Sequence, residues 1–251
     1  MAEDWDAATY DRIADPMARW GTAVLDRLPL RGDERVLDAG CGSGRVTERL
    51  LARLPLGHVI ALDASPAMIE EARRRLAPFA DRVTYVVANL LDPLPIDPPV
   101  DAILSTATFH WVPDHDRLFR NLAAVLWPGG RLVAQCGGLG NVESVLRAAD
   151  DVGASSWLEP LRRPLFATAE ETADRLRVAG FDRVETWLHA EPTRIEPGEP
   201  LETFLATVIL REHLARLPES QRASFVRAVA GRIPGGEIDY VRLNIVAQRA
   251  A

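Results

Sequence analysis

Residues 35–63 read RVLDAGCGSGRVTERLLARLPLGHVIALD, and this stretch decides the fold. It begins with a short apolar segment typical of a buried strand, continues through glycines at positions 40, 42 and 44, and then has apolar residues at helical spacing. A second apolar segment, 58–62, ends at Asp63. Glycine permits a positive φ angle and lets a ligand approach the backbone, and the first turn of a helix presents free N–H groups. The stretch therefore predicts a strand, a ligand-binding loop, a helix and a second strand.

The alternation of strand and helix continues through the first half of the chain. Further strands are predicted at 83–87, 101–105 and 131–135, and helices at 46–54, 66–76 and 114–126. The strands are continuously apolar, which is typical of a sheet that helices cover on both faces. Alternation at this spacing predicts a doubly wound, mostly parallel α/β sheet, and such sheets bind ligands at the carboxyl ends of their strands.

The second half of the chain is mostly helical, with two more strands. Helices are predicted at 142–152, 169–179 and within 200–231, and strands at 183–190 and 238–248. Gly180 is expected to end the second of these helices, and Pro218 to interrupt the third region. We predict four segments, which are a helical N-terminal cap broken near Asp15-Pro16 (1–30), an α/β core (31–190), a helical insertion serving as a substrate lid (191–236) and the final strand of the core sheet (237–251).

The composition limits the partners. The 251 residues carry a net charge of −7, which argues against nucleic acid as the main partner, because phosphate binding needs a basic surface. No apolar run is long enough for a membrane span and the acidic N-terminus lacks a secretory layout, so we expect a cytoplasmic protein. Lysine is absent, which excludes a Schiff-base lysine and the lysine of a P-loop. Cys41 and Cys136 suggest neither a disulfide framework nor a metal site.

The glycine loop discriminates between two classes of ligand. A dinucleotide fingerprint, G-x-G-x-x-G, would need glycine where Arg45 or Thr47 stands. The observed pattern, D-x-G-x-G-x-G, suits a ligand without a pyrophosphate, whose cationic amino-acid end could be met by Asp38. Asp63 could accept hydrogen bonds from both hydroxyls of a ribose, or it could merely cap the helix that begins at Pro66.

Two stretches carry a family resemblance. Residues 38–44, DAGCGSG, and residues 62–68, LDASPAM, closely resemble the class I methyltransferases that depend on S-adenosylmethionine (SAM). The resemblance implies a Rossmann-like sheet of seven strands that ends in an antiparallel hairpin, formed here by 183–190 and 238–248. It also implies SAM as the cofactor, S-adenosylhomocysteine as its product and no metal.

The same resemblance assigns cofactor contacts residue by residue. Gly40 and Gly42 would line the methionyl part, and Ala64 and Met68 would flank the adenine, with burial in a helix core as the alternative for Met68. Asn89 stands where the family usually has an aspartate that contacts the adenine amine; its carbonyl can still accept that hydrogen bond, and a plain turn residue is the alternative. The full set of expected cofactor contacts is Asp38, Gly40, Cys41, Gly42, Gly44, Asp63, Ala64, Met68, Asn89, Leu90 and Ser105.

Residues 105–114, STATFHWVPD, follow the fourth strand at the same edge of the predicted sheet. They resemble the strand-four motif of trans-aconitate methyltransferase, the carrier-protein malonyl methyltransferase of biotin synthesis and juvenile hormone acid methyltransferase, which all methylate a carboxylate. The likeness to the first of these extends to Asp4-Trp5, to Tyr10 and to the helical segment 202–222.

Each candidate residue on the substrate side also has an alternative interpretation that involves no substrate. His110 is the candidate catalytic residue, as a hydrogen-bond partner of the substrate or as a general base, and a structural role is its alternative. Trp111 is predicted to form a pocket wall, with plain core packing as its alternative. Tyr10 and Trp20 lie on predicted helices that could close over the cofactor, or they could pack in the core. Arg211 could clamp an anionic substrate, or form a surface ion pair with a neighbouring glutamate.

These expectations define one main hypothesis and two alternatives. We expect a SAM-dependent methyltransferase that acts on a small molecule, by O-methylation of a carboxylic acid, either as a monomer or as a homodimer. A C- or N-methyltransferase of secondary metabolism on the same scaffold is the alternative enzyme. A SAM-binding protein without activity is the other alternative, which burial of His110 and Trp111 away from the pocket would favour.

Overall fold

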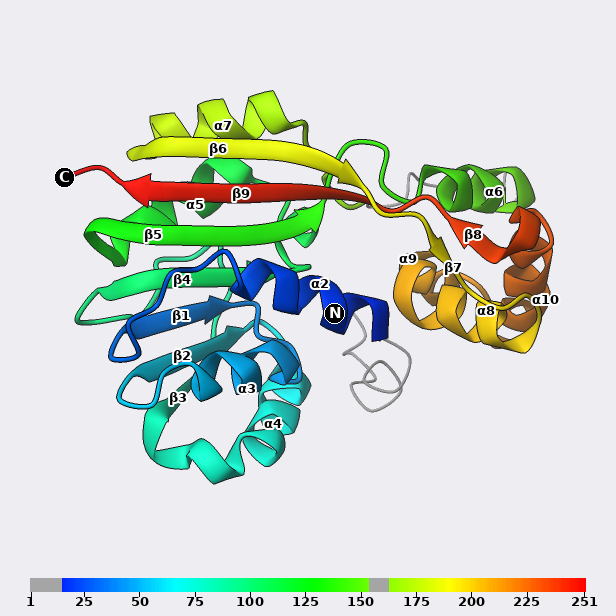
Figure 1. Ribbon diagram of the computed structural model, residues 1–251. Helices are drawn as coiled ribbons and strands as arrows, with labels where there is room; N and C mark the ends of the chain where they lie inside the picture. The colour runs from blue at the N-terminus through cyan, green and yellow to red at the C-terminus, as the bar shows by residue number, and fades with distance from the viewer. Residues whose placement is uncertain (1–14, 154–162) are drawn as a thin grey trace.

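The computed structural model describes residues 15–153 and 163–251, with side chains from residue 20 onward. Within these ranges, the strands form a seven-stranded sheet in the order β3-β2-β1-β4-β5-β9-β6 (Figure 1). The strands of this sheet are β1 (Arg35–Ala39), β2 (His58–Asp63), β3 (Val83–Val87), β4 (Val100–Thr106), β5 (Leu126–Gly137), β6 (Phe181–Ala190) and β9 (Val241–Arg249). The first five are parallel, and β9 runs antiparallel to both β5 and β6. This is the predicted doubly wound sheet with a closing antiparallel hairpin.

Helices cover both faces of the sheet, as the continuously apolar strands predict. The helices are α2 (Asp15–Leu25), α3 (Arg45–Ala52), α4 (Pro66–Arg75), α5 (His115–Ala124), α6 (Glu143–Gly153), α7 (Ala169–Val178), α8 (Glu199–Phe204), α9 (Arg211–Ala215) and α10 (Glu219–Ala230). Val36 of β1 packs in a cluster with residues of α2, α3 and α4, whereas its neighbour Leu37 packs in another cluster with α5 and α7. Successive strand residues thus enter opposite cores, which requires both of them to be apolar.

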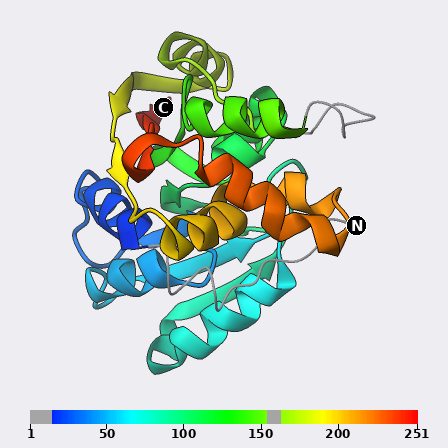
Figure 2. The same cartoon turned by 90° about the vertical axis from the view of Figure 1, so that its right-hand side faces the viewer.

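A third hydrophobic cluster lies beyond the carboxyl ends of the parallel strands. It joins α6, α8, α10 and a π-helical turn, Leu205–Ile209, to Trp20 and Tyr240. Figure 2 looks at the molecule from this side, with the helices in front of the sheet. Helix α6 falls within the predicted core segment 31–190, yet it packs with the predicted lid segment 191–236. The four-segment division of the chain stays a prediction.

The predicted final strand, 238–248, is divided in two, which corrects its expected start. The short strand β8 (Glu237–Ile238) pairs with β7 (Thr193–Arg194) in a separate ribbon, and β9 begins only at Val241. The break has a local cause at Asp239, whose carboxylate accepts hydrogen bonds from the Ser144 backbone N–H (2.9 Å) and hydroxyl (2.6 Å). Asp239 therefore ties the connection to the first turn of α6, where a carboxylate is favourable.

Two helix boundaries follow the sequence signals closely. Gly180 follows the end of α7 with a φ of +93°, the left-handed conformation that glycine adopts readily. Pro218 separates α9 from α10, as predicted, and the helical region 200–231 is further divided by the π-helical turn. Within the described ranges, no helix has both the length and the apolar character needed to cross a membrane.

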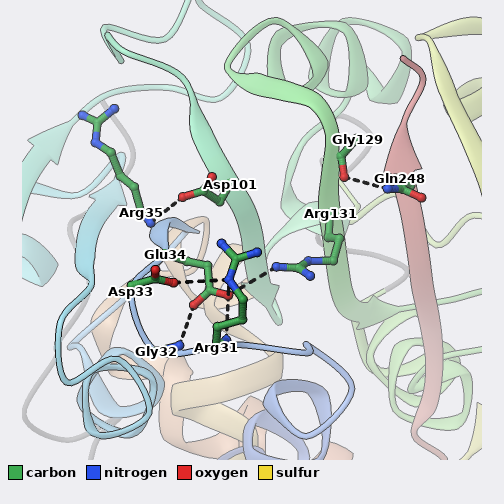
Figure 3. Close-up of polar contacts among 9 residues, drawn as sticks. All are labelled: Arg31, Gly32, Asp33, Glu34, Arg35, Asp101, Gly129, Arg131 and Gln248. Carbon is green, nitrogen blue, oxygen red and sulfur yellow. Dashed lines mark hydrogen bonds and ion pairs between the residues drawn. The ribbon is translucent and has the colours of Figure 1, made fainter.

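The amino-terminal edge of the sheet is held together by a buried carboxylate. Glu34 has no exposed side-chain surface, and it accepts hydrogen bonds from the backbone N–H groups of Arg31 (2.7 Å) and Gly32 (2.9 Å) (Figure 3). The Arg131 guanidinium of β5 lies 3.5 Å from the same carboxylate. Burial acts to raise the pKa of Glu34, but the backbone donors and the Arg31 charge outweigh it, and the pKa is lowered.

Glu34→Gln should therefore lower the free energy of unfolding by about 2 kcal/mol at pH 7, because one amide N–H₂ would face a donor and the Arg131 charge would lose its partner. Because the folded-state pKa is depressed, the contribution of Glu34 is complete above its unfolded pKa of about 4.3 and is lost as the pH falls through the folded value. Urea unfolding at pH 7 and pH 4 measures both effects. Asp33→Asn is the matched control, since Asp33 pairs with Arg31 only at the surface and should change stability by less than about 0.5 kcal/mol. Equal losses in the two variants would contradict the assignment.

Candidate active site

A cavity of about 1100 Å³ lies at the carboxyl ends of the parallel strands. Its walls come from the loops that follow β1, β2, β3 and β4, from α2, and from the π-helical turn and α9. The cavity is thus at the place where doubly wound sheets bind ligands. The glycine loop and the helical region beyond the sheet both contribute to it.

The glycine loop after β1 is fixed from two sides. The backbone N–H groups of Gly40 and Cys41 both donate to the Leu62 carbonyl of β2, at 2.8 and 2.9 Å. Gly40 has a φ of +83°, and a Cβ atom placed on it would lie 2.2 Å from Thr108 Oγ1, so no larger residue fits without movement. A Cβ atom on Gly42 would meet nothing within 4 Å, because Gly42 lines the open cavity.

Gly44 has a different place from the other two glycines of the loop. It is the N-cap of α3, with a φ of +83°, and it is not among the residues that line the cavity. A Cβ atom on Gly44 would lie 3.3 Å from Ala72 of α4 and 3.2 Å from Leu76, the residue directly after α4. Its glycine is therefore explained by helix geometry and by the close approach of α3 to α4.

Asp38 is a buried carboxylate at the end of β1, directly before the loop. The Thr47 hydroxyl donates a hydrogen bond to Asp38 Oδ2 (2.7 Å), whereas Oδ1 is buried without a hydrogen-bond partner among the described residues. Burial raises the pKa of Asp38 to about 7; the Thr47 hydrogen bond opposes this rise and the nearby Asp63 charge adds to it. A buried acceptor of this kind would be stabilised by a cation.

Asp63, at the end of β2, joins the loops after β1 and β2. Its Oδ2 accepts a hydrogen bond from the Gly42 N–H (2.9 Å) and its Oδ1 accepts one from the Ser65 N–H (2.9 Å). Asp63 also lines the cavity, and each oxygen of a carboxylate can accept more than one hydrogen bond, including those from ligand hydroxyls. The alternative that Asp63 caps α4 is wrong, because the Ser65 hydroxyl is the cap and accepts from the Met68 N–H (3.2 Å).

The loops after β2 and β3 form the opposite end of the cavity. Ala64 and Met68 line it from one side, and Asn89 and Leu90 from the other. Met68 is buried and still reaches the cavity wall. Asn89 Oδ1 accepts a hydrogen bond from the Leu91 N–H (3.0 Å), so this side chain also serves its local turn.

In the loop after β4, Trp111 lies on the cavity wall, whereas its neighbour His110 does not. Trp111 lines the cavity and is 40% exposed. His110 is buried and does not line the cavity; its Nδ1 accepts a hydrogen bond from the Gly137 N–H (3.3 Å), and its ring stacks on Phe166. Burial lowers the pKa of His110 well below the usual value, and the charges of Arg242 and His115 lower it further. His110 is therefore neutral at physiological pH.

Arginines from several parts of the chain line the cavity. Among the described lining residues, five carry a guanidinium and two carry a carboxylate, although the whole chain has a net charge of −7. The arginines are Arg45, Arg163, Arg211, Arg216 and Arg242, and the acids are Asp63 and Glu212. The cavity is thus locally cationic, which attracts anionic ligands.

Comparison with known proteins agrees with this geometry. Residues 36–130 match the methyltransferase domain family. The chain is 38% identical to trans-aconitate 2-methyltransferase of Methylobacterium nodulans over 193 residues, which are 74% of this chain and 68% of that protein. It is 32% identical to the enzyme of the same name from Methylobacterium radiotolerans over 99% of both chains.

The chain belongs to the trans-aconitate 2-methyltransferase family. It is a SAM-dependent methyltransferase with the class I fold. The fold has solved counterparts, such as the YcgJ protein of Bacillus subtilis, with a TM-score of 0.65 at 16% identity over 93% of this chain and 99% of that one. Geranyl diphosphate C-methyltransferase of Streptomyces coelicolor, solved with S-adenosylhomocysteine, gives a TM-score of 0.57 at 18% identity over 93% of this chain and 79% of that one.

Three features in or next to the methyltransferase cavity fit SAM. The buried Asp38 Oδ1, without a described partner, suits a neighbouring ammonium group. The open side of Gly42 leaves room for a ligand against the backbone. The Asp63 carboxylate lies on the wall next to Ala64 and has the acceptor capacity that a ribose needs.

The pKa of Asp38 predicts a pH-dependent affinity of this methyltransferase for SAM. Below pH 7 the group becomes protonated and loses its attraction for the cation, so the affinity of the wild type relative to Asp38→Asn should fall about tenfold from pH 8 to pH 6. Comparing with the variant cancels the titration of the ligand itself. Calorimetric titration with S-adenosylhomocysteine at several pH values measures it.

In the ligand-free enzyme, the free energy of unfolding should change with pH in the opposite direction to the affinity for SAM. The folded pKa of Asp38 lies above the unfolded value of about 3.9, so its contribution to stability is complete below that value and is lost as the pH rises towards 7. Asp182→Asn is a suitable control, because Asp182 is an exposed acid on β6 whose loss should leave the pH profile unchanged. A profile of the Asp38→Asn variant that is parallel to the wild type would contradict the prediction.

The predicted site residues of this methyltransferase fall into three groups. Those on the cavity wall are Trp20, Gly40, Cys41, Gly42, Asp63, Ala64, Met68, Asn89, Leu90, Trp111 and Arg211. Those described but not on the wall are Asp38, Gly44, Ser105 and His110. Ser105 is buried, and its hydroxyl donates to the Ala39 carbonyl (2.6 Å), which fixes β4 against β1. Tyr10 and Asp4-Trp5 lie outside the described residues.

Sequence reasoning missed several wall residues. Arg45, Arg163, Arg216, Arg242 and Gln135 line the cavity, and none of them was predicted. Arg45 directly follows the glycine loop, so its position was a usable signal. The others carry no local pattern that separates them from surface residues of the same type.

The cavity wall also carries a thiol, that of Cys41. Cys41 lines the cavity, and burial, followed by the charges of Asp38 and Asp63, raises the pKa of its thiol well above the usual value, so the thiol is neutral. Among the described residues, no group of three or more histidine, cysteine or acidic side chains could hold a metal ion. The absence of a metal from the reaction stays a prediction.

Proposed function

We propose that this enzyme transfers a methyl group to a carboxylate oxygen of a small polycarboxylate such as trans-aconitate. This proposal rests mainly on one observation: guanidinium groups outnumber carboxylates on the cavity wall of a protein whose net charge is negative. Guanidinium groups bind carboxylates through paired, charge-assisted hydrogen bonds. The names of the curated relatives point to the same acceptor.

The chemistry of a carboxylate acceptor suits the residues that are present. A carboxylate is ionised at neutral pH and needs no general base. His110, the predicted base, is neutral, buried and not on the wall, which favours its structural alternative. When bound, SAM supplies a methyl group on a sulfonium; the S–CH₃ bond breaks as the O–CH₃ bond forms, and the electron pair stays on sulfur.

The chain's own contribution is positioning and the exclusion of water. The glycine loop and Asp63 fix one end of the cavity, and Trp111 provides an aromatic wall after β4. Ile209 and Arg211 reach the cavity from the π-helical turn and α9, so the segment 191–236 serves as the substrate lid, together with α6. When the enzyme holds two reactants in line, binding has already met most of the entropy cost of bringing them together. Location in the cytoplasm and the choice between monomer and homodimer stay predictions.

The test is a screen of acceptors with SAM that carries a labelled methyl group. Tricarboxylates, dicarboxylates and monocarboxylates are offered beside phenols and amines of similar size. We expect a base-labile methyl ester from a polycarboxylate, and a much lower rate with each uncharged analogue. Label found only in base-stable products would overturn the carboxylate proposal and favour the C- or N-methyltransferase alternative.

A further inference from the structure

A buried arginine on the last strand forms part of the cavity wall. Arg242, near the start of β9, is 4% exposed and lines the cavity. It pairs with Gly137 at the carboxyl end of β5. Its guanidinium carbon lies 4.7 Å from the centre of the Trp20 ring of α2, a cation–π distance. A positive charge is thus built into the floor of the site.

A network of side-chain amides fixes the direction of this guanidinium. Arg242 Nε donates to Gln135 Oε1 (3.4 Å), and Gln135 Nε2 donates to Asn244 Oδ1 (2.8 Å). Asn244 Oδ1 also accepts from Arg27 Nη1 (2.5 Å), and Asn244 Nδ2 donates back to the Arg242 carbonyl (3.2 Å). Gln135, Arg242 and Asn244 are all buried. Such a network orients the planar guanidinium before a ligand arrives, which reduces the entropy cost of binding.

Trp20 provides a second and independent indication of a ligand. Its side chain is 7% exposed and lines the same cavity, while its edge packs against Tyr240 at 4.9 Å between ring centres. The indole N–H of Trp20 is buried without a hydrogen-bond acceptor among the described residues. A buried indole N–H nearly always has an acceptor, so this donor indicates a ligand atom that accepts.

We propose that Arg242 and Trp20 together bind a carboxylate of the acceptor that is not methylated. The guanidinium supplies the charge, and the indole N–H supplies a directed donor beside it. Arg211, at the start of α9, and Arg216, directly after it, line the same cavity, so more than one carboxylate of a small molecule can be held at once. This inference rests on the proposed function, and it makes Arg242 and Trp20 determinants of specificity for polycarboxylates over monocarboxylates.

The test compares Trp20→Phe and Arg242→Gln with the wild type. Binding of trans-aconitate is measured by calorimetry in the presence of S-adenosylhomocysteine, and kcat/KM is measured for trans-aconitate and for the monocarboxylate crotonate. We expect Arg242→Gln to weaken trans-aconitate binding about 50-fold and Trp20→Phe about tenfold, because each loses part of a buried, charge-assisted contact. For crotonate, kcat/KM should change by less than about threefold, since the contact serves a carboxylate that crotonate lacks. Affinity for S-adenosylhomocysteine should stay within about twofold.

Arg120→Gln is the matched control, because Arg120 is an exposed arginine on α5 and should leave every quantity unchanged. Trp20→Phe keeps the aromatic ring and removes only the N–H, so it tests the inference even if Arg242→Gln does not fold. Wild-type affinity for trans-aconitate in both variants would overturn this inference alone, and so would an equal loss for trans-aconitate and crotonate. A wild-type enzyme that binds no carboxylate would instead overturn the proposed function.

Discussion

Gly40→Ala is expected to lower the affinity for SAM by at least about 1000-fold, because two penalties coincide at this position. The φ of +83° is unfavourable for alanine, and the new methyl group would lie 2.2 Å from Thr108 Oγ1 and 2.7 Å from Thr108 Cβ. Relief requires the loop to move, which would break the hydrogen bonds that Gly40 and Cys41 donate to Leu62. The loop would then lose the shape that lines the cavity. Calorimetric titration with S-adenosylhomocysteine, beside thermal unfolding, measures the effect.

Gly180→Ala separates the backbone penalty from the clash. Gly180 has a φ of +93°, and a Cβ atom there would meet nothing within 4 Å. This variant should lose about 1 kcal/mol of stability and no SAM affinity. The double variant Gly40→Ala, Thr108→Gly should recover part of the affinity, because it removes the side chain in the way. Unchanged affinity in Gly40→Ala would contradict the role of the loop.

The sheet could be predicted because its signals are local. Each buried strand is a contiguous apolar run, and the residues of β1 alternate between the two cores, so Val36 and Leu37 must both be apolar. The glycine loop is equally local, since its positive φ angles at Gly40 and Gly42 fall within a few residues. The strand, glycine loop and carboxylate proposed to bind the cofactor therefore follow from residues 35–63.

The acceptor end could not be predicted in the same way, because its residues meet only in the folded chain. Gln135 and Arg242 are 107 positions apart and become neighbours through the antiparallel register of β5 and β9. In sequence, Arg242 is one of two arginines in a strand that also contains Asn244 and Gln248, and nothing in this local pattern marks it as part of a site. The division of the last strand likewise depends on Asp239 meeting α6. No pattern along the sequence indicates either of these contacts.

The acids near the glycine loop and the arginines proposed to bind the acceptor match the charges of the two reactants. Asp38 and Asp63 lie at or near the glycine loop, where we propose that the cationic cofactor binds, and Arg211, Arg216 and Arg242 lie where we propose that the anionic acceptor binds. Charges placed in this way attract each reactant to its own end and disfavour exchange of the two. Positive charge leaves sulfur as a carboxylate loses its negative charge, so the site mainly needs to orient the reactants.

Asp63→Asn should reduce SAM affinity about 100-fold, the second largest effect we expect. Both carboxylate oxygens accept from backbone N–H groups, those of Gly42 and Ser65, and an amide can offer an oxygen to only one of them. The other N–H would face an N–H₂ group, which disturbs the junction of the loops after β1 and β2. The variant also loses the charge that strengthens hydrogen bonds from ribose hydroxyls. The expected loss therefore combines a distorted loop with a weaker acceptor.

Asp182→Asn is the control for this substitution, because Asp182 is an exposed aspartate on the edge strand β6 and should leave SAM affinity unchanged. Asp63→Ala distinguishes the two causes of loss: it removes the acceptor without placing an N–H₂ group against Gly42 or Ser65. If the loss of affinity comes mainly from the wrongly placed N–H₂ group, Asp63→Ala will bind S-adenosylhomocysteine more tightly than Asp63→Asn. If the lost charge and ribose contact dominate, the two variants will bind equally weakly, and wild-type affinity in both would remove Asp63 from the cofactor site.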